Sequence, residues 1–473
     1  MDVDKKFLGI TAGIVTVILI VAIVISWVLI NPRISRPGTG ITPQQVSPIS
    51  NSGHTYYVSK TGNNTSGLSW STAWDELNQI KWSVIQPGDT ILLDGGSTKM
   101  VYTTTLTVGK SGTQAAPINI KRAKESGRNG KVVIFGGRSM PLPYCGQKNY
   151  VNQTTGVTDN GIDVGTNSWI SIDGMNWGGI VIYGHSSDGI NFDNNSSNDT
   201  LRNMEIYDNG SAFQSAGIWQ PQTAGHGVFL QGSNLTFEQM NIYDNADDAF
   251  NSESGISNLT IRRSWLHITR EDPTQAGLPF NQCVHQDGIQ IFGGGVQSGV
   301  LIEDSVFGPG LKEGTILGQL LTSSGVQATV NNVIIRNTLF MNKVINIMGY
   351  PQVKEKDWRI DHVTAYSQLQ AIFLEGSGNT VTNSIFYGGQ FYLPDGLANS
   401  SGNCQWHTTG YTASIIGLTA DPSFVTDVAP FNENTPLVQL ANSNFALQAT
   451  SPCKGQGSSI TSVAQFLKMV TGS

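Results

Sequence analysis

Four polar residues recur at the start of successive predicted strands and have the side chains for acid–base or metal chemistry. Each is followed by a small residue and an apolar one: Asp188-Gly-Ile, His226-Gly-Val, Asp248-Ala-Phe and Asp287-Gly-Ile. If these segments stack as neighbouring strands about 4.8 Å apart, the four side chains form a column roughly 15 Å long. Carboxylates packed so closely share protons or hold a hard cation such as calcium, and acids beside a histidine can serve acid–base catalysis.

Asp247 and His285 flank this column, and a long insertion separates Arg270 from His285. The local excess of acids favours a functional cluster, since it falls in two neighbouring repeats: Asp244, Asp247, Asp248, Glu271, Asp272 and Asp287. A structural interpretation competes with it. An Asp-Gly or His-Gly pair before a strand is also ordinary corner chemistry, in which the side chain caps backbone amides and the glycine takes a positive φ.

A short repeat must position these residues, because an apolar strand, a polar pair and a second apolar alternation recur along the chain. The repeat starts fall 21 to 41 residues apart, and they begin at Ser171, Thr200, Thr236, Thr260, Leu301, Ile334, Arg359 and Thr380. A minimum near 21 with variable excess fits one coil of a solenoid plus loops inserted at a corner. Such short strands bury an apolar face only when stacked coil on coil. The pattern predicts an all-β, right-handed parallel β-helix over residues 54–473, with a C-terminal cap from about residue 400; a β-sandwich is the alternative.

The composition agrees with a β-rich outer domain. Of 473 residues only 13% are charged, 54 are Gly, and the net charge is −7. Charged residues make up roughly 25% of an ordinary domain. A helical protein is disfavoured, and so is a disordered one, since apolar residues are plentiful. Lys and Arg total 27 against 34 acids, with no basic run, so no nucleic-acid partner is expected.

The first residues predict a membrane anchor. Residues 7–30 form an uncharged apolar run after a short tail, residues 1–6, and the run is long enough to cross a bilayer as one helix. A cleaved signal peptide is the alternative, but the start mixes acids with lysines and no small-x-small site follows. Residues 31–53 are rich in Pro, Gly, Ser and Thr and predict a flexible linker. We expect a single-pass protein of the cell membrane with its large domain outside.

Both ends of the outer domain carry a resemblance to known proteins. His54-Thr-Tyr-Tyr-Val-Ser-Lys-Thr-Gly, Gln86-Pro-Gly-Asp-Thr-Ile and, at the other end, Asp421-Pro-Ser-Phe-Val resemble the pectate lyase-like superfamily of right-handed β-helices. The resemblance covers roughly residues 55–457. It implies this fold, while the superfamily hosts many chemistries.

A more specific resemblance concerns calcium. Asp244-Asn-Ala-Asp-Asp-Ala-Phe-Asn is similar to the calcium-binding Asp cluster of family 9 polysaccharide lyases, except that Asn251 replaces a further Asp. Those enzymes remove the proton α to a uronate carboxylate with a lysine in the following coil. Here no Lys lies between Asp248 and Leu311, so Lys312 or Arg270 would have to substitute. Polygalacturonases share an Asp-Asp pair and a Gly-His-Gly, but in the opposite chain order, and their Arg-x-Lys is missing.

Trp219 and Trp265 lie near the predicted column and could stack on sugar rings, although most Trp in such folds fill the core. Cys404 and Cys453 could form a disulfide in an oxidising compartment, and Cys145 and Cys283 are weaker candidates as partners.

Two classes of function follow, and polysaccharide is the expected partner in both. The first is a carbohydrate-active enzyme, with lyase chemistry ahead of hydrolase. In the lyase, calcium is held by acids of the column, and a basic group removes the proton. The second class is a non-catalytic adhesin or glycan-binding stalk in which the column only caps corners. The oligomeric state is not predicted. The candidate metal ligands are Asp247, Asp248, Asp287 and Asp188, and the candidate catalytic residues are Lys312, Arg270, His285 and His226.

Overall fold

The computed structural model describes most of residues 53–472. The described residues are 53–143, 150–153, 156–215, 218–221, 225–252, 256–270, 286–291, 295–317, 320–321, 326–342, 345–349, 355–367, 370–395, 397–411, 417–426 and 437–472. The predicted anchor, residues 7–30, lies outside them. In the described part of the chain, no helix combines the length and the apolar character that crossing a membrane requires.

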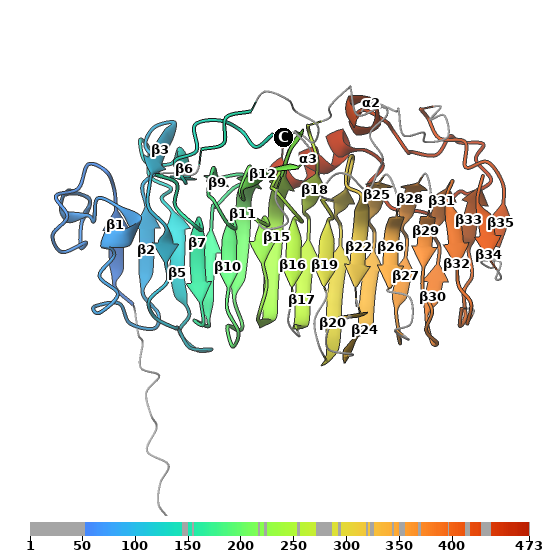
Figure 1. Ribbon diagram of the computed structural model, residues 1–473, viewed down its shortest axis with the longest axis horizontal. Helices are drawn as coiled ribbons and strands as arrows, with labels where there is room; N and C mark the ends of the chain where they lie inside the picture. The colour runs from blue at the N-terminus through green and yellow to red at the C-terminus, as the bar shows by residue number, and fades with distance from the viewer. Residues whose placement is uncertain are drawn as a thin grey trace, which may run out of the picture. The chain divides into compact units, whose positions relative to one another are not determined.

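The strands form three faces in which each strand pairs in parallel with its counterparts in the coils before and after it (Figure 1). The third face is an 11-stranded sheet. Its strands are β4 (Leu106–Thr107), β7 (Ile162–Gly165), β10 (Ile190–Phe192), β14 (Val228–Phe229), β16 (Phe250–Ser252), β19 (Ile289–Ile291), β22 (Glu313–Leu317), β26 (Ile345–Gly349), β29 (Gln370–Phe373), β32 (Gln390–Tyr392) and β34 (Thr409–Tyr411).

The first and second faces belong to one continuous 22-stranded sheet, because β11 (Thr200–Tyr207) and β15 (Ser233–Tyr243) run through both. The first face also contains β1 (Thr55–Val58), β2 (Thr90–Leu93), β5 (Ile118–Arg122), β8 (Ile170–Asp173), β17 (Ser257–Arg262), β20 (Gly295–Glu303), β24 (Val326–Arg336), β27 (Arg359–Asp361) and β30 (Thr380–Thr382). The second contains β3 (Lys99–Tyr102), β6 (Lys131–Phe135), β9 (Ile180–Tyr183), β18 (Trp265–His267), β21 (Val306–Phe307), β25 (Leu339–Asn342), β28 (Thr364–Ser367), β31 (Ile385–Tyr387), β33 (Asn403–Trp406) and β35 (Gly417–Thr419). This coil-on-coil pairing confirms the parallel β-helix.

One residue in each coil from β11 to β30 bends the chain from the first face to the second. These residues adopt the left-handed conformation, with φ between 45° and 63°: Asn203, Gln239, Arg263, Asp304, Asn337, His362 and Asn383. Asn and Asp tolerate this region better than other non-glycine residues, because their short polar side chains bond locally. The sharp bend lets strands of the same coil enclose a common core.

The core is a stack of apolar side chains contributed by the same position of each repeat. The second residue of the repeat points inward in every coil and is at most 1% exposed: Ile172, Leu201, Phe237, Ile261, Ile302, Ile335, Ile360 and Val381. Burying one such side chain contributes roughly 1.5–3 kcal/mol. The predicted repeat therefore marks the layer that holds successive coils in register.

The next position of the repeat points outward and alternates in charge along the first face. Strand pairing brings these residues side by side in the order Lys121, Asp173, Arg202, Glu238, Arg262, Glu303, Arg336 and Asp361. Arg202 Nε lies 2.8 Å from Asp173 Oδ2, and Arg262 Nη2 lies 2.9 Å from Glu238 Oε2. Opposite charges on facing residues favour pairing between successive coils. If a strand paired with the coil after next instead, like charges would face each other.

Arg262→Glu should destabilise the first face, because it places a carboxylate between Glu238 and Glu303. We expect a loss of roughly 1–2 kcal/mol in the free energy of unfolding, measured as a lower urea midpoint. Lys124 is an exposed loop residue outside this row of alternating charges, so Lys124→Glu is the matched charge-reversal control. Equal midpoints for the two variants would show that the charge order has no effect on stability.

The C-terminal segment returns along the second face (Figure 1). It contains α2 (Leu437–Ala441) and α3 (Val463–Thr471), and α3 begins where the Ser462 side chain accepts from Gln465 N at 3.1 Å. The Phe466 ring of α3 packs edge-on against Trp177 at 5.8 Å between centroids, and Gln239 Nε2 donates to Val470 O at 3.1 Å. The segment thereby covers apolar side chains of the second face that would otherwise face water.

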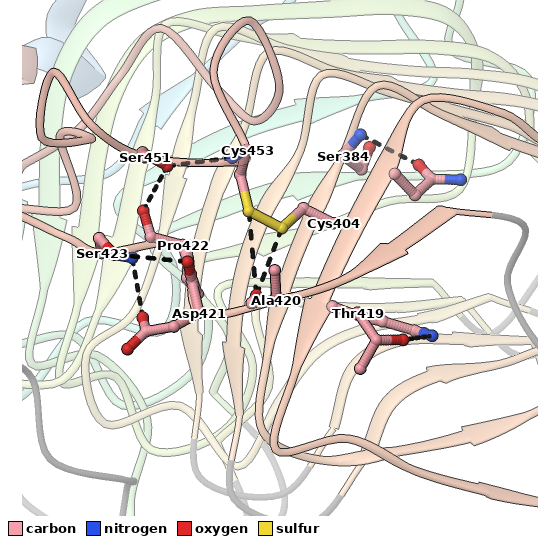
Figure 2. The surroundings of a disulfide bond; sticks show 11 residues. Ser384, Cys404, Thr419, Ala420, Asp421, Pro422, Ser423, Ser451 and Cys453 are labelled. Carbon is pink, nitrogen blue, oxygen red and sulfur yellow. Dashed lines mark hydrogen bonds between the residues drawn. A yellow bond between two sulfur atoms is a disulfide. The ribbon is translucent and has the colours of Figure 1, made fainter.

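A disulfide attaches this segment to the last coils. It joins Cys404 of β33 to Cys453, and both residues are fully buried, as predicted for this pair (Figure 2). Cys453 N donates to Ser451 Oγ at 3.1 Å, and Ser451 Oγ donates to Pro422 O at 2.6 Å. The hydrogen bonds order the turn beside the disulfide.

Candidate functional site

The predicted column exists, and main-chain hydrogen bonds link its members. Asp188 Oδ1 accepts from His226 N at 2.8 Å, Asp248 Oδ1 accepts from Asp287 N at 2.9 Å, and Asp287 Oδ1 accepts from Glu313 N at 3.1 Å. The coils of His226 and Asp248 are joined through Gly227 N and Asp248 O at 2.9 Å. Asp188, His226, Asp248 and Asp287 precede β10, β14, β16 and β19 at one corner, so the predicted column runs across four successive coils.

The column has a rung at each end that the predicted set omitted. Asp188 N donates to Asn160 Oδ1 at 3.1 Å, and Glu313 caps the other end. A sequence signal for both exists, since Asn160-Gly161 and Glu313-Gly314 repeat the polar residue–glycine pair of Asp188 and Asp287. Each of these six positions thus has a polar side chain of the kind found at corners of the chain, whether or not it also takes part in catalysis or metal binding.

His226 lies between two carboxylates. Its Nδ1 is 2.9 Å from Asp188 Oδ1, and its Nε2 is 3.7 Å from Asp247 Oδ2. Burial alone would lower the pKa of His226, but the hydrogen bond and charge of Asp188, with Asp248 and Asp247, raise that pKa to about 9. The imidazole is therefore protonated at neutral pH, and both of its nitrogens are donors.

Asp248 and Asp287 are the two fully buried acids of the column. Burial, and then the charge of Asp247, raise the pKa of Asp248 to about 7. Burial and the charge of Asp248 likewise raise the pKa of Asp287 to about 7. Asn251 Nδ2 donates to Asp248 Oδ2 at 2.8 Å, while the buried Asn251 Oδ1 has no hydrogen-bond partner among the described residues. Two neighbouring carboxyls thus resist ionisation beside an unsatisfied oxygen.

These shifts predict an unusual pH dependence of stability without calcium. Unfolded aspartates have a pKa of about 4 and unfolded histidine about 6.5, so the folded chain holds these protons more tightly than the unfolded chain. The free energy of unfolding should fall as the pH rises from about 4 to about 7 through Asp248 and Asp287, and on to about 9 through His226. Buried Asp199 and Glu355, whose pKa values are also raised to about 7, act in the same direction.

Melting temperatures at about pH 5 and about pH 8, in the presence of a chelator, test this expectation. Asp248→Asn/Asp287→Asn should flatten the slope. A melting temperature that rises between these pH values would contradict the assignment.

A small cavity opens beside the column. Its volume is about 10 Å³, which is room for about one water molecule. Its walls come from the second face and from the column, and they include Tyr243, Asp244, His267, Asp247, Gln286 and Asp287. The cavity therefore connects the acids to the aromatic side chains of the neighbouring face.

The predicted catalytic residues separate into different environments. Arg270 Nη1 is 3.0 Å from Asp208 Oδ1, and Arg270 Nε is 3.5 Å from Asp244 Oδ2. Burial lowers the pKa of Arg270, but these two aspartates raise it overall, so its guanidinium remains a cation. Lys312 directly precedes the Glu313 rung, and Lys312 N donates to Gln286 O at 3.0 Å. His285 lies outside the described residues.

The two candidate tryptophans differ in what the structure describes. Trp265 is stacked on His267 with 3.7 Å between ring centroids, and its Nε1 donates to Gly308 O at 2.8 Å. It packs against the apolar cluster beneath the C-terminal segment. Trp219 belongs to the hairpin strand β13 (Ile218–Pro221), and its side chain is outside the described set.

No group of three or more His, Cys, Asp or Glu side chains in the described residues is arranged to hold a metal ion. The column carboxylates are directed instead to main-chain amides.

Comparison with known proteins gives only distant likenesses. No family model and no curated protein matches the sequence. Among solved structures, the pectate lyase Pel9A is 17% identical, over 84% of this chain and 90% of that one, with a TM-score of 0.46. A rhamnogalacturonan lyase is 12% identical, over 88% and 98%, with a TM-score of 0.48. PfbA, a surface adhesin of Streptococcus pneumoniae, is 11% identical, over 71% and 82%, with a TM-score of 0.43.

The chain is a parallel β-helix. That statement rests on its own strand pairing. Likenesses this remote do not assign an activity, so the site itself must carry the functional argument.

Proposed function

We propose that this chain is a membrane-anchored, cell-surface polysaccharide lyase that cleaves a uronate-containing glycan by calcium-assisted β-elimination. The observation that carries the proposal is the pair of buried carboxyls, Asp248 and Asp287, on adjacent coils, of which Asp287 lines the cavity. Their raised pKa values mean that two neighbouring negative charges are unfavourable there without a cation.

The described side chains are not arranged to hold a metal ion, but the oxygen donors at this corner are of the kind that calcium prefers. Asp247, Asp248 and Asp287 would hold it, and the unsatisfied Asn251 Oδ1 is a further oxygen at the same place. Asp188 is less suited, because its carboxylate already pairs with the protonated ring of His226. When bound, calcium would neutralise the uronate carboxylate and acidify the adjacent proton.

Of the candidate bases we propose Lys312, which would have to lose its own proton to solvent before it could act. Arg270 is a cation paired with Asp208 and Asp244, and His226 is already protonated at neutral pH. Lys312 lies in the coil directly after Asp287, and its charge acts on the Asp287 carboxyl. It would take the proton next to the carboxylate, a carbon–carbon double bond would form, and the glycosidic oxygen would leave with a proton from solvent. Protonated His226, three coils away, would bind a neighbouring uronate.

The disulfide supports the proposed location at the cell surface. The buried disulfide between Cys404 and Cys453 is typical of an oxidising compartment. We propose that residues 7–30 anchor the chain, that the described domain lies outside the cell, and that its coils wind in the right-handed sense usual for parallel crossovers.

A non-catalytic glycan-binding protein is the second candidate, and one observation favours it. Asp188, Asp248 and Asp287 each accept a main-chain N–H from the next coil. This is the capping role that a passive corner would need.

A polyuronate assay separates the two candidates. The full chain in detergent should form product that absorbs in the ultraviolet, from the new double bond, with calcium present, and none with a chelator. Asp247→Asn/Asp248→Asn should reduce the rate by at least about 100-fold, while Asp163→Asn, an acid of the same sheet outside the column, should retain it. Reducing ends without absorbance would indicate a hydrolase, and binding without any product would indicate the passive protein.

A further inference from the structure

A ladder of stacked aromatic rings crosses the second face next to the column. We call Phe135, Tyr183, Tyr207, Tyr243 and His267 the tyrosine ladder. Strand pairing places each ring opposite the next, and centroid distances between neighbours are 4.9 to 5.0 Å. The Tyr183–Tyr207 and Tyr207–Tyr243 planes are nearly parallel, at 4° and 8°. The faces of the middle rings are thus occupied, and these rings present their edges and hydroxyl groups.

The hydroxyls of the ladder differ in their partners. Tyr243 Oη donates to Glu205 Oε1 at 2.9 Å. The hydroxyls of Tyr183 and Tyr207 have no hydrogen-bond partner among the described residues, and neither is a buried unsatisfied group. Both side chains are half-buried. They offer two fixed, water-accessible groups that can donate and accept, held at the spacing of successive coils.

The charged side chains along the ladder outside the column are balanced. Glu205 pairs with Lys131 at 3.0 Å, and Arg270 pairs with Asp208 and Asp244. Arg138, which is buried, donates from Nη1 to the Asp208 carbonyl at 3.2 Å. Three cations thereby balance three carboxylates. A surface of this kind neither attracts nor repels a charged sugar strongly, and its hydroxyls suit neutral sugars.

The ladder leads into the candidate site. Tyr243 and His267 line the same cavity as Asp247 and Asp287. We infer that the tyrosine ladder is a glycan-binding track that holds neutral, hydroxyl-rich sugar residues of the chain whose uronate lies at the column. This inference rests on the proposed function and narrows its substrate to a glycan that combines uronate with neutral sugars.

The test removes two hydroxyls and keeps the rings. The probe is a set of oligosaccharides that alternate uronic acid and neutral sugar, and binding to the full chain in detergent is measured by calorimetry with a chelator present. Tyr183→Phe/Tyr207→Phe should raise the Kd about tenfold, the effect of losing two hydrogen bonds. Tyr57→Phe, a half-buried tyrosine near the N-terminal end of the solenoid, is the matched control and should leave the Kd unchanged.

Each outcome has a distinct meaning. In the calcium-supported lyase assay, the same double variant should raise KM with kcat unchanged, because the ladder does not touch the reacting atoms. A Kd equal to that of the wild type would overturn the ladder and leave the lyase standing. Wild-type binding without product would overturn the lyase while the ladder is still judged by the Kd. A wild-type chain that binds none of the probes would overturn the ladder, and the lyase would then be judged by product formation with calcium.

Discussion

Arg270→Met is expected to lower the free energy of unfolding by about 3–5 kcal/mol, because it removes the only described cation that pairs with both Asp208 and Asp244. Both carboxylates are buried. Leu142 N donates to Asp208 Oδ1 at 2.6 Å, and Thr269 N donates to Asp244 Oδ1 at 2.8 Å. Losing the guanidinium would leave two negative charges with little access to water. Arg270 Nη1 also donates to Leu142 O at 3.0 Å, so the loop that carries Leu142 would loosen as well.

Urea unfolding, followed by tyrosine fluorescence and by hydrogen exchange of the coils around Asp208, measures this effect. Arg336→Met is the matched control, because Arg336 is 56% exposed and its pairing with Glu303 is expected to contribute at most about 1 kcal/mol. Adding Asp208→Asn and Asp244→Asn to Arg270→Met should recover part of the loss. Equal midpoints for the Arg270 and Arg336 variants would show that the buried network is not a stabilising unit.

Cys404→Ala/Cys453→Ala should cost about 2–5 kcal/mol, because the disulfide closes a loop between cysteines 49 residues apart. Loss of the disulfide should affect the C-terminal segment more than the coils. The disulfide attaches the segment that carries α3, and Phe466 of that helix packs on Trp177. We expect the C-terminal segment to detach at lower temperature than the coils unfold.

Limited proteolysis and tryptophan fluorescence report this detachment. The double variant should be cut within residues 437–472 before the coils are cut, with a red shift as Trp177 and Trp265 become exposed. A reductant should reproduce both effects in the wild type, and Ser462→Ala, which removes only the cap of α3, should produce a smaller change. Simultaneous loss of segment and coils would contradict a separately attached segment.

The sequence repeat predicted the core well, because solenoid coils place equivalent residues in equivalent positions. Its second residue, as in Ile172 or Phe237, is the buried layer. The third residue carries a further signal, which a pattern of polar residues alone does not reveal. Its alternation of acid and base, from Asp173 through Arg202 to Glu238, becomes meaningful once strands are known to pair in register.

The candidate site was predictable only in part. The polar residue–glycine pairs predicted that Asp188, His226, Asp248 and Asp287 would stack, and the main-chain bonds show that they do. The different roles of adjacent Asp247 and Asp248 depend on which side chain turns into the corner. Sequence spacing does not contain that information.

Contacts between distant segments were beyond prediction for a different reason. Arg270 meets Asp208 and Asp244 only because the chain after β18 passes over the preceding corners. Trp265 is covered because a non-repeating C-terminal segment folds back over the second face. The repeat predicts contacts between neighbouring coils. It does not predict contacts made by segments that leave the coils and fold back over them.

The central claim is that the acid column is a cation site, and calorimetric titration of the full chain with calcium tests it most directly. We expect saturable binding near one ion per chain that is lost in Asp247→Asn/Asp248→Asn and retained in Asp163→Asn. Heats that are absent, or equal in the wild type and the column variant, would contradict the claim and leave these carboxylates as caps of a passive corner.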